Sequence, residues 1–363
     1  MICVDMSVFH SLTIKDIIQE TSESVSFSLE VPDTLKEIFR FKPGQYLTFK
    51  IPDKSGELRR CYSIISNPFV GEDLRVAVKK VANGHGSVYI NHTLKANDSL
   101  DVFPPLGNFF PSFNSAVPKH YVLFAGGSGI TPMISIIKAV LHKEPKSTIA
   151  LFYGNREKKS IMFFDLLNTL SVKSDEHLKI YHLLENDENA RDKILSGLMT
   201  EEKISQLLLT YGVDKKNSEY FICGPGVMME NVKKALQRKQ VGAAQIHIEY
   251  FTAPAGLPEP TDFIDLRQYP FCKATITCDG DTKQVSITPG DSVLHAALFS
   301  KIDAPHACTE GSCGTCRAKL TSGKVDMKVH YALLDQEVKD GYILTCQARP
   351  LTSEISVDYD RAY

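Results

Sequence analysis

The chain has 363 residues, enough for two or three domains, and its 43% hydrophobic and 23% charged residues are typical of a soluble globular protein. A formal net charge of −2 gives no indication of the basic surface by which proteins bind nucleic acid or anionic membranes. The first residues lack a basic stretch followed by a long apolar run, so we expect no signal peptide and a cytoplasmic location.

Residues 1–115 are predicted to form a small antiparallel β-barrel that binds a cofactor. Apolar and polar residues alternate, as in half-buried strands, at residues 25–29, 46–51 and 74–78. Pro-Gly at 43–44 and Pro-Pro at 104–105 are read as turns between strands.

Two short motifs in this segment offer groups that suit a flavin nucleotide. At the end of a predicted strand, Arg60 supplies a planar fork of donors for a pyrophosphate, Tyr62 a ring for stacking and Ser63 a hydroxyl. Gly86 and Ser87 begin a predicted helix, whose first N–H groups suit phosphate. Taken alone, the first motif is equally compatible with an ordinary exposed strand end.

Residues 116–252 alternate between apolar strands and helical patterns, which predicts a doubly wound parallel sheet. The strands are predicted at residues 121–125, 148–153, 178–184, 220–223 and 245–250. Residues 132–142 place their apolar side chains on one helical face. The glycines and the proline within 121–141 argue against a membrane span over that stretch.

Two glycine-rich turns follow strands of this sheet, at the edge where such sheets bind ligands. The first runs from Gly126 to Pro132, and the second is Cys223-Gly224-Pro225. The glycines permit close approach of the backbone to a pyrophosphate, although the pattern is not the G-x-G-x-x-G fingerprint of dehydrogenases. A tight turn without a ligand is the alternative.

Residues 253–266 are rich in proline and glycine and are predicted to be a linker. Residues 267–363 combine a hairpin around Asp279-Gly280 and a short helix at 291–300 with a cysteine-rich loop, which favours an α+β ferredoxin module of the β-grasp type.

Four cysteines in this module carry the strongest signal in the chain. They have the spacing C-x4-C-x2-C with a distant fourth member, the ligand pattern of a plant-type [2Fe–2S] cluster, and they are Cys308, Cys313, Cys316 and Cys346. Structural zinc usually needs two short cysteine pairs, and a Rieske centre needs two histidines. A disulfide pair is a further alternative.

Together these motifs resemble the ferredoxin–NADP reductase superfamily with a C-terminal plant-type [2Fe–2S] domain, over nearly the whole chain. The order of domains is similar to that of reductase components of multicomponent oxygenases, including the phenylacetyl-CoA epoxidase and steroid hydroxylase systems. The resemblance implies that FAD is bound by Tyr46, Arg60, Cys61, Tyr62, Ser63, Val78, Lys80, Gly86 and Ser87.

The resemblance also implies the site for NAD(P)H and the residues at the place of hydride transfer. The nucleotide would be bound by Gly126, Gly127, Ser128, Gly129, Thr131, Pro132, Arg156, Cys223, Gly224 and Pro225. Ser63, Cys223 and Glu249 would act at the hydride-transfer centre, and Phe251 would cover the flavin ring.

The coenzyme is predicted to be NADPH, with NADH also possible. Arg156, Lys158 and Lys159 outnumber Glu157 after the second strand, and a basic cluster suits a 2′-phosphate. The alternative is that these are solvated loop charges.

Electron counting then predicts the function. A hydride carries two electrons and the cluster accepts one, so FAD must stand between them. We expect transfer from NADPH to FAD, to the cluster and then to a diiron or Rieske oxygenase. The alternatives are a stand-alone NAD(P)H diaphorase and a flavin reductase carrying a zinc-stabilised docking module.

Overall fold

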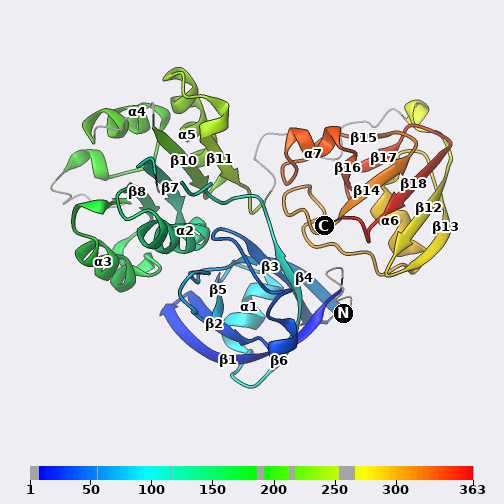
Figure 1. The fold of residues 1–363 in the computed structure, drawn as a ribbon, viewed down its shortest axis with the longest axis horizontal. Coiled ribbons are helices and arrows are strands. Elements are labelled where there is room, and N and C mark those ends of the chain that lie inside the picture. Colours follow the sequence, from blue (N-terminus) through cyan, green and yellow to red (C-terminus); the bar gives the residue numbers. More distant parts are fainter. Residues whose placement is uncertain are drawn as a thin grey trace.

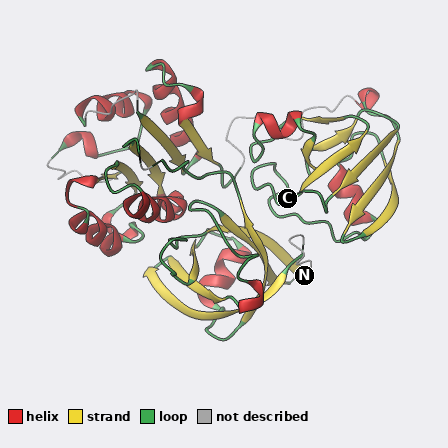
Figure 2. Ribbon diagram, in the orientation of Figure 1, coloured by secondary structure: helices red, strands yellow, loops and turns green. Residues whose placement is uncertain are grey.

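The computed structural model describes residues 8–54, 56–114, 116–185, 192–211, 217–252 and 266–362. The chain forms three bodies in sequence order: a barrel drawn in blue, an α/β body in green and a β-rich body in yellow to red (Figure 1). Most of the helices lie in the middle body (Figure 2). The expected linker at 253–266 falls almost entirely outside the described residues. No helix in the described ranges has the length and apolar composition needed to cross a bilayer.

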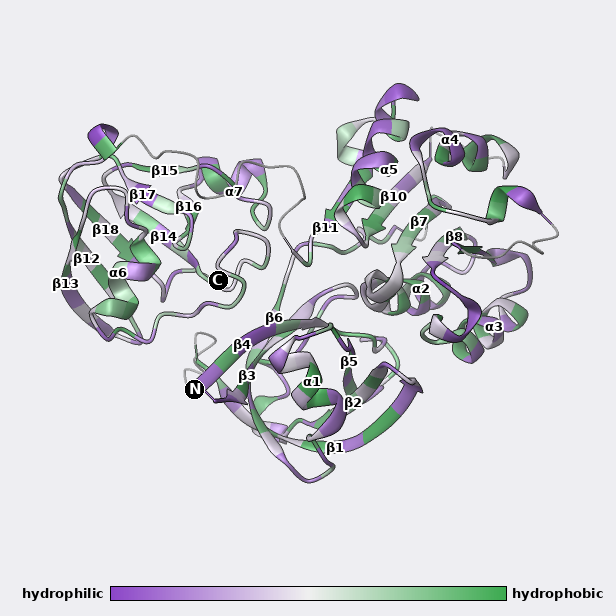
Figure 3. Ribbon diagram, turned by 180° about the vertical axis from the view of Figure 1, so that it is seen from behind, coloured by the Kyte–Doolittle hydropathy of each residue, from purple (hydrophilic) through white to green (hydrophobic). Residues whose placement is uncertain are grey.

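The first body is the expected antiparallel barrel. Its strands are β1 (His10–Thr21), β2 (Ser24–Glu30), β3 (Tyr46–Asp53), β4 (Gly56–Ser63), β5 (Leu74–Lys79) and β6 (Ser99–Leu106). They pair in the order β4-β3-β6-β1-β2-β5, and a bridge between Ile64 and Val76 links the two ends of this order. Hydrophilic and hydrophobic segments alternate along β1 (Figure 3), and Leu12 and Ile14 of this strand are buried in the barrel core. Helix α1 (His85–His92) packs against β3 and β5.

One turn expected from the sequence is wrong. Pro104 and Pro105 lie inside β6 and do not end it. The pairing of β6 with β3 shifts register between Tyr46 and Thr48, opposite this proline pair. Proline lacks the N–H that a regular ladder requires and is tolerated at such irregularities.

The middle body is a parallel sheet with a hydrophobic core on each face, which confirms the doubly wound fold. Its strands are β7 (His120–Gly126), β8 (Thr148–Asn155), β9 (Leu178–Leu184), β10 (Ser218–Cys223) and β11 (Ile246–Glu249), in the order β11-β10-β7-β8-β9. Its helices are α2 (Ile130–Lys143), α3 (Phe164–Lys173), α4 (Glu201–Thr210) and α5 (Gly226–Arg238). Helix α2 begins two residues before the predicted start at residue 132, because the glycine turn leads directly into it.

The third body is a mixed five-stranded sheet packed on a helix, as a ferredoxin module requires. Its strands are β12 (Cys272–Cys278), β13 (Asp281–Ile287), β14 (Arg317–Ser322), β16 (Tyr342–Leu344) and β18 (Glu354–Asp358), in the order β13-β12-β18-β14-β16. Strands β15 (Val325–Met327) and β17 (Ala348–Pro350) form a separate two-stranded sheet. Helix α6 (Val293–Phe299) packs against β13 and β17, and helix α7 (Asp335–Lys339) packs against β16. The predicted hairpin and helix are both present.

Candidate functional site

The four cysteines come together at the end of the third body. Cys308, Cys313 and Cys316 lie in the loop between α6 and β14, and Cys346 lies in the turn after β16. Gly311 and Gly314 have φ of +78° and +69°, a left-handed conformation that side chains disfavour. The chain can therefore curl tightly between the cysteines.

The cysteine side chains form two close pairs, Cys308 with Cys313 and Cys316 with Cys346. Backbone N–H groups point at the sulfurs: the amide of Cys308 donates to Cys313 Sγ and the amide of Glu310 to Cys308 Sγ, both at 3.4 Å. Two thiolates for each of two irons is the ligand arrangement of a [2Fe–2S] cluster, and N–H···S bonds are its usual supports.

The electrostatics of the loop also fit a bound cationic centre. Contact with Cys346, followed by burial, raises the pKa of the Cys316 thiol well above its ordinary value. Contact with Cys313, followed by burial, does the same to the pKa of the Cys308 thiol. The hydrogen bond from Cys316 lowers the pKa of the Cys346 thiol. One thiolate is therefore stabilised at the cost of its neighbour, and ionising all four thiols together requires compensating metal charge. In the described ranges, no group of three or more Cys, His, Asp or Glu side chains converges on a single ion position.

Strand β4 presents the predicted flavin motif on its two faces. Arg60 and Tyr62 point toward α1, where a Cβ added at Gly86 would lie 3.3 Å from Arg60 Cγ and 3.7 Å from Tyr62 Oη. Only glycine leaves this space open. Ser87 closes the same turn, because its hydroxyl accepts a hydrogen bond of 3.0 Å from the backbone N–H of Val81.

The other face of β4 meets the cysteine loop. A cavity of about 740 Å³ separates the two and has three walls. Tyr46, Cys61 and Ser63 belong to the barrel wall, and Arg60 reaches the same cavity although its side chain begins on the face toward α1. Cys308 and Cys313 belong to the cysteine wall, and Glu249, Tyr250 and Phe251 to the third wall at the end of β11. A flat heterocycle in this cavity would contact both the flavin motif and the cysteine loop.

Not every expected flavin residue reaches this cavity. The Val78 side chain is buried in the barrel core, and its carbonyl accepts a hydrogen bond from Asn91. Lys80 is half-buried and follows the end of β5. Neither side chain borders the cavity, and Tyr62, Gly86 and Ser87 do not border it either.

The two glycine turns of the middle body pack directly against each other. A Cβ at Gly126 would lie 2.5 Å from Pro225 Cδ, and a Cβ at Gly129 would lie 2.1 Å from the Cys223 carbonyl oxygen. Gly127 has φ of +52°. Glycine is therefore required for the close packing of β7 and β10 at their carboxyl ends, whether or not a ligand is bound.

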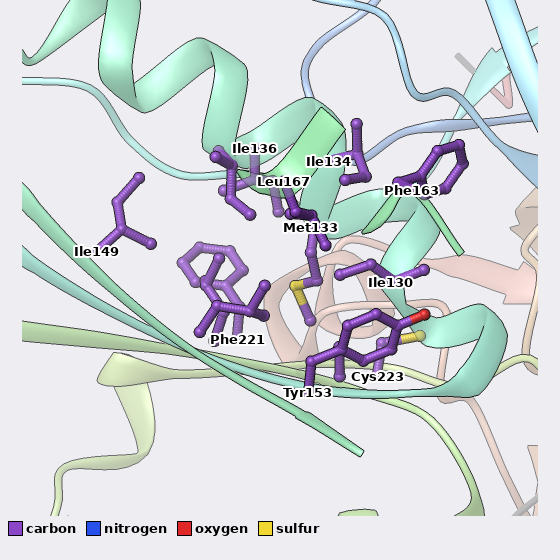
Figure 4. Close-up of a cluster of buried hydrophobic side chains, with 14 of the residues drawn as sticks. Ile130, Met133, Ile134, Ile136, Ile149, Tyr153, Phe163, Leu167, Phe221 and Cys223 are labelled. Atoms are coloured by element: carbon purple, nitrogen blue, oxygen red, sulfur yellow. The ribbon is translucent and has the colours of Figure 1, made fainter. Parts of the chain in front are cut away.

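Other residues support this turn from inside. The Thr131 hydroxyl donates to the Ser128 carbonyl at 3.0 Å, and Pro132 occupies the first turn of α2. The Tyr153 hydroxyl donates to the Gly127 carbonyl at 3.0 Å. Tyr153 and Cys223 lie together beneath Ile130 and Met133 of α2 (Figure 4).

Cys223 and Glu249 are opposite each other on the parallel strands β10 and β11. Burial raises the pKa of Glu249 to about 8, and its Oε2 is buried without a hydrogen-bond partner. Burial, followed by the nearby Glu249, raises the pKa of the Cys223 thiol well above its usual value. Both groups are therefore largely protonated at neutral pH, and Glu249 can donate a hydrogen bond into the cavity.

Lys79 is a site residue that the sequence did not lead us to expect. Its Nζ would lie 3.9 Å from a Cβ added at Gly127, so this cationic side chain of the barrel lies beside the first glycine turn of the middle body. Burial lowers the pKa of this lysine, and Arg156 lies near enough to lower it further. Lys79 and the exposed Arg156 together make this edge of the sheet favourable for phosphate groups.

The contact between the barrel and the cysteine loop likewise has no signal in the sequence. Arg59, only 7% exposed, forms an ion pair with Asp303 and donates to the Ala304 carbonyl at 3.2 Å. Thr48 and Thr315 form a buried hydrogen bond of 3.1 Å across the same interface. The third body also touches the second, through the Tyr250 and Tyr331 rings.

Family comparisons agree with the three bodies. The chain matches an oxidoreductase FAD-binding domain at residues 11–110, an oxidoreductase NAD-binding domain at 123–234 and a 2Fe-2S iron-sulfur cluster binding domain at 276–351.

Two relatives align with this chain over nearly the whole length of both proteins. The chain is 37% identical over 356 residues to a subunit of 1,2-phenylacetyl-CoA epoxidase from Escherichia coli, covering 98% of this chain and 99% of that protein. It is 33% identical to the ferredoxin reductase component of 3-ketosteroid-9-alpha-monooxygenase from Rhodococcus rhodochrous, covering 96% of each. Among solved structures, phthalate dioxygenase reductase superposes with a TM-score of 0.59 at 25% identity, covering 96% of this chain and 98% of that one.

Proposed function

Because the chain belongs to the ferredoxin–NADP reductase superfamily, in the group with a C-terminal [2Fe–2S] domain, we propose that it is the reductase component of an oxygenase system. It transfers electrons from NADPH through FAD and the cluster to a partner oxygenase. The observation that carries the proposal is the cavity bounded by the flavin motif, the cysteine loop and the end of β11. FAD in this cavity supplies the conversion of a two-electron hydride into single electrons.

Each of the three bodies contributes the residues that bind one of the three redox groups. Arg60, Tyr62 and the Gly86-Ser87 turn hold FAD, while Tyr46, Cys61 and Ser63 border its ring. Cys308, Cys313, Cys316 and Cys346 hold the cluster. The turns at residues 126–132 and 223–225 bind the nicotinamide nucleotide.

At the centre, Cys223 and Glu249 position the reacting groups without carrying charge. A buried, neutral Glu249 leaves the site free of a negative charge that would oppose hydride arrival. Phe251, 41% exposed, lies at the cavity mouth, where it can cover the flavin ring and be displaced by nicotinamide.

The NADPH preference rests on Arg156 and Lys79 at one edge of the sheet. The partner is proposed from the relatives, which are reductase components of oxygenase systems. We propose a diiron oxygenase of the phenylacetyl-CoA epoxidase kind or a Rieske oxygenase, acting in the cytoplasm.

Anaerobic rapid mixing of the purified protein with one equivalent of NADPH tests the order of transfer. Flavin absorbance should bleach first, and the rhombic electron paramagnetic resonance (EPR) signal of a reduced [2Fe–2S] cluster should follow. A colourless, zinc-containing third body, or a cluster that is reduced before the flavin, would contradict the proposal.

A further inference from the structure

One pair of tyrosine rings joins the third body to the residues that close the flavin cavity. Tyr250, the first residue after β11, packs its ring against that of Tyr331, with the ring centroids 5.1 Å apart and the planes inclined at 45°. Tyr331 lies in residues 328–334, the segment between β15 and α7, which we call the β15–α7 loop. The second and third bodies therefore meet next to Glu249, at the proposed place of hydride transfer.

The β15–α7 loop is fixed to the cysteine loop. The amide of Ala332 donates to the Gly311 carbonyl at 3.2 Å. A Cβ added at Gly311 would lie 3.2 Å from Val329 Cγ2, and one added at Gly314 would lie 3.2 Å from Ala332 Cβ. Both glycines stand between cysteines of the predicted cluster, so the fold of the cysteine loop determines where the Tyr331 ring lies.

Tyr250 is held on its other side by the middle body. Its ring packs on the core of that body, and its hydroxyl donates to Glu230 Oε1 of α5 at 3.5 Å. Tyr250 borders the flavin cavity together with its sequence neighbours Glu249 and Phe251. Tyr250 and Tyr331 also border a second cavity of about 280 Å³, which leaves room for the Tyr250 ring to shift. The contacts of Tyr250 therefore fix the course of the chain after β11, and with it the position of Phe251.

Phe251 is the residue that a nicotinamide ring would have to move. It is 41% exposed and borders the flavin cavity. In the proposed function it covers the flavin ring and gives way to nicotinamide. Any contact that stabilises the covering position therefore opposes coenzyme binding by the same free energy.

We propose that Tyr331 of the third body is a positioning residue for the coenzyme site: it supports Tyr250 and thereby holds Phe251 over the flavin, so that nicotinamide entry and close docking of the third body oppose each other. This inference rests on the proposed function. Coupling between two sites is reciprocal, so bound NADP⁺ loosens the β15–α7 loop by the factor by which that loop weakens NADP⁺ binding. Departure of NADP⁺ then tightens the third body on the flavin site, at the stage when reduced flavin passes electrons to the cluster.

Titration of the oxidised holoprotein with NADP⁺, followed by the flavin difference spectrum, tests this in Tyr331→Ala. Loss of one aromatic contact should tighten NADP⁺ binding roughly two- to tenfold. Tyr331→Phe keeps the ring and should bind like the wild type. Phe299→Ala is the matched control, because it removes a ring that is 84% exposed at the end of α6 in the same body. The direction discriminates, since damage to the fold would weaken NADP⁺ binding.

Hydrogen exchange supplies the reciprocal measurement. With saturating NADP⁺, the amide of Ala332 should exchange faster in the wild type but not in Tyr331→Ala. Unchanged or weaker NADP⁺ binding by Tyr331→Ala, at full iron and flavin content, would overturn the inference. If Tyr331→Ala loses iron, Tyr331→Leu, which keeps most of the side-chain volume, is judged by the same criterion. A wild type that carries no flavin or binds no NADP⁺ would instead contradict the proposed function.

Discussion

Arg59 of the barrel and Asp303 of the ferredoxin module form an ion pair across the interface between these bodies. Arg59 is almost fully buried and also bonds Glu57, while Lys50 lies 3.6 Å from the same aspartate. The pair holds the cysteine loop against the flavin motif, so electron transfer inside the molecule should depend on it.

Charge reversal at Asp303 should therefore slow cluster reduction. Asp303→Lys places a third cation beside Arg59 and Lys50, and such like-charge contacts cost several kcal/mol. We expect electron transfer from flavin to cluster to slow at least tenfold, as measured by single-turnover rapid mixing, while flavin reduction by NADPH is unchanged. Asp281→Lys, on the β12–β13 hairpin, is the control. Equal rates in the two variants would show that the ion pair does not position the cluster.

The same pair should be insensitive to pH near neutrality. Burial alone would raise the pKa of Asp303, but the hydrogen bond and charge of Arg59 hold it below its usual value. A carboxylate with a lowered pKa contributes stability that is present above its unfolded pKa of about 4 and is lost only at lower pH. The rate of electron transfer from reduced flavin to the cluster should therefore not depend on the ionisation of Asp303 when the pH is varied between about 5 and 8.

Arg60→Ala should weaken FAD binding. The guanidinium would make charge-assisted hydrogen bonds to the pyrophosphate, each worth about 1.5–3 kcal/mol, or roughly ten- to a hundredfold in affinity. Flavin content after extensive dialysis measures this loss. Arg40→Ala is the control, because Arg40 is an exposed barrel arginine paired with Glu37. Full flavin retention in Arg60→Ala would remove this residue from the FAD site.

Arg156→Ala should lower kcat/KM for NADPH about 30-fold, equivalent to about 2 kcal/mol, and leave NADH nearly unchanged. The loss should appear in KM, since the 2′-phosphate is remote from the hydride and binds ground and transition states alike. Lys179→Ala is the control, because Lys179 is an exposed lysine of the same body that pairs with Glu176 at 3.5 Å. Equal losses with both coenzymes would indicate that Arg156 is structural.

Glu249→Gln should stabilise the protein at alkaline pH. Burial raises the pKa of Glu249 to about 8, so the folded protein favours the neutral carboxyl group. The contribution of this group to the free energy of unfolding is therefore fully present below the unfolded pKa of about 4.3 and declines as pH rises from there toward 8. The decline amounts to a few kcal/mol at most. Urea unfolding of the wild type and of the variant across this range should show a flatter profile for Glu249→Gln. The exposed Glu354→Gln should follow the wild type, and parallel profiles for all three proteins would contradict the assigned burial.

The parts of the site with local signals could be predicted from sequence. The cysteine spacing and the glycine turns are encoded within a few residues, because backbone conformation there demands particular residue types. The interface contacts could not be predicted: Thr48 and Thr315 are 267 residues apart, and no periodicity links them. Lys79 was not predicted, because its position beside the first glycine turn depends on packing between two bodies that are far apart in sequence.

The central claim is that electrons reach the outside through flavin first and cluster second, and Cys316→Ser tests it most directly. This variant removes one member of the buried Cys316–Cys346 pair and should lose the [2Fe–2S] spectrum while keeping FAD. NADPH-dependent reduction of ferricyanide should survive, because that acceptor can draw electrons from flavin, whereas reduction of the partner oxygenase should cease. Loss of ferricyanide reduction at full FAD content, or continued electron delivery to the oxygenase, would contradict the account.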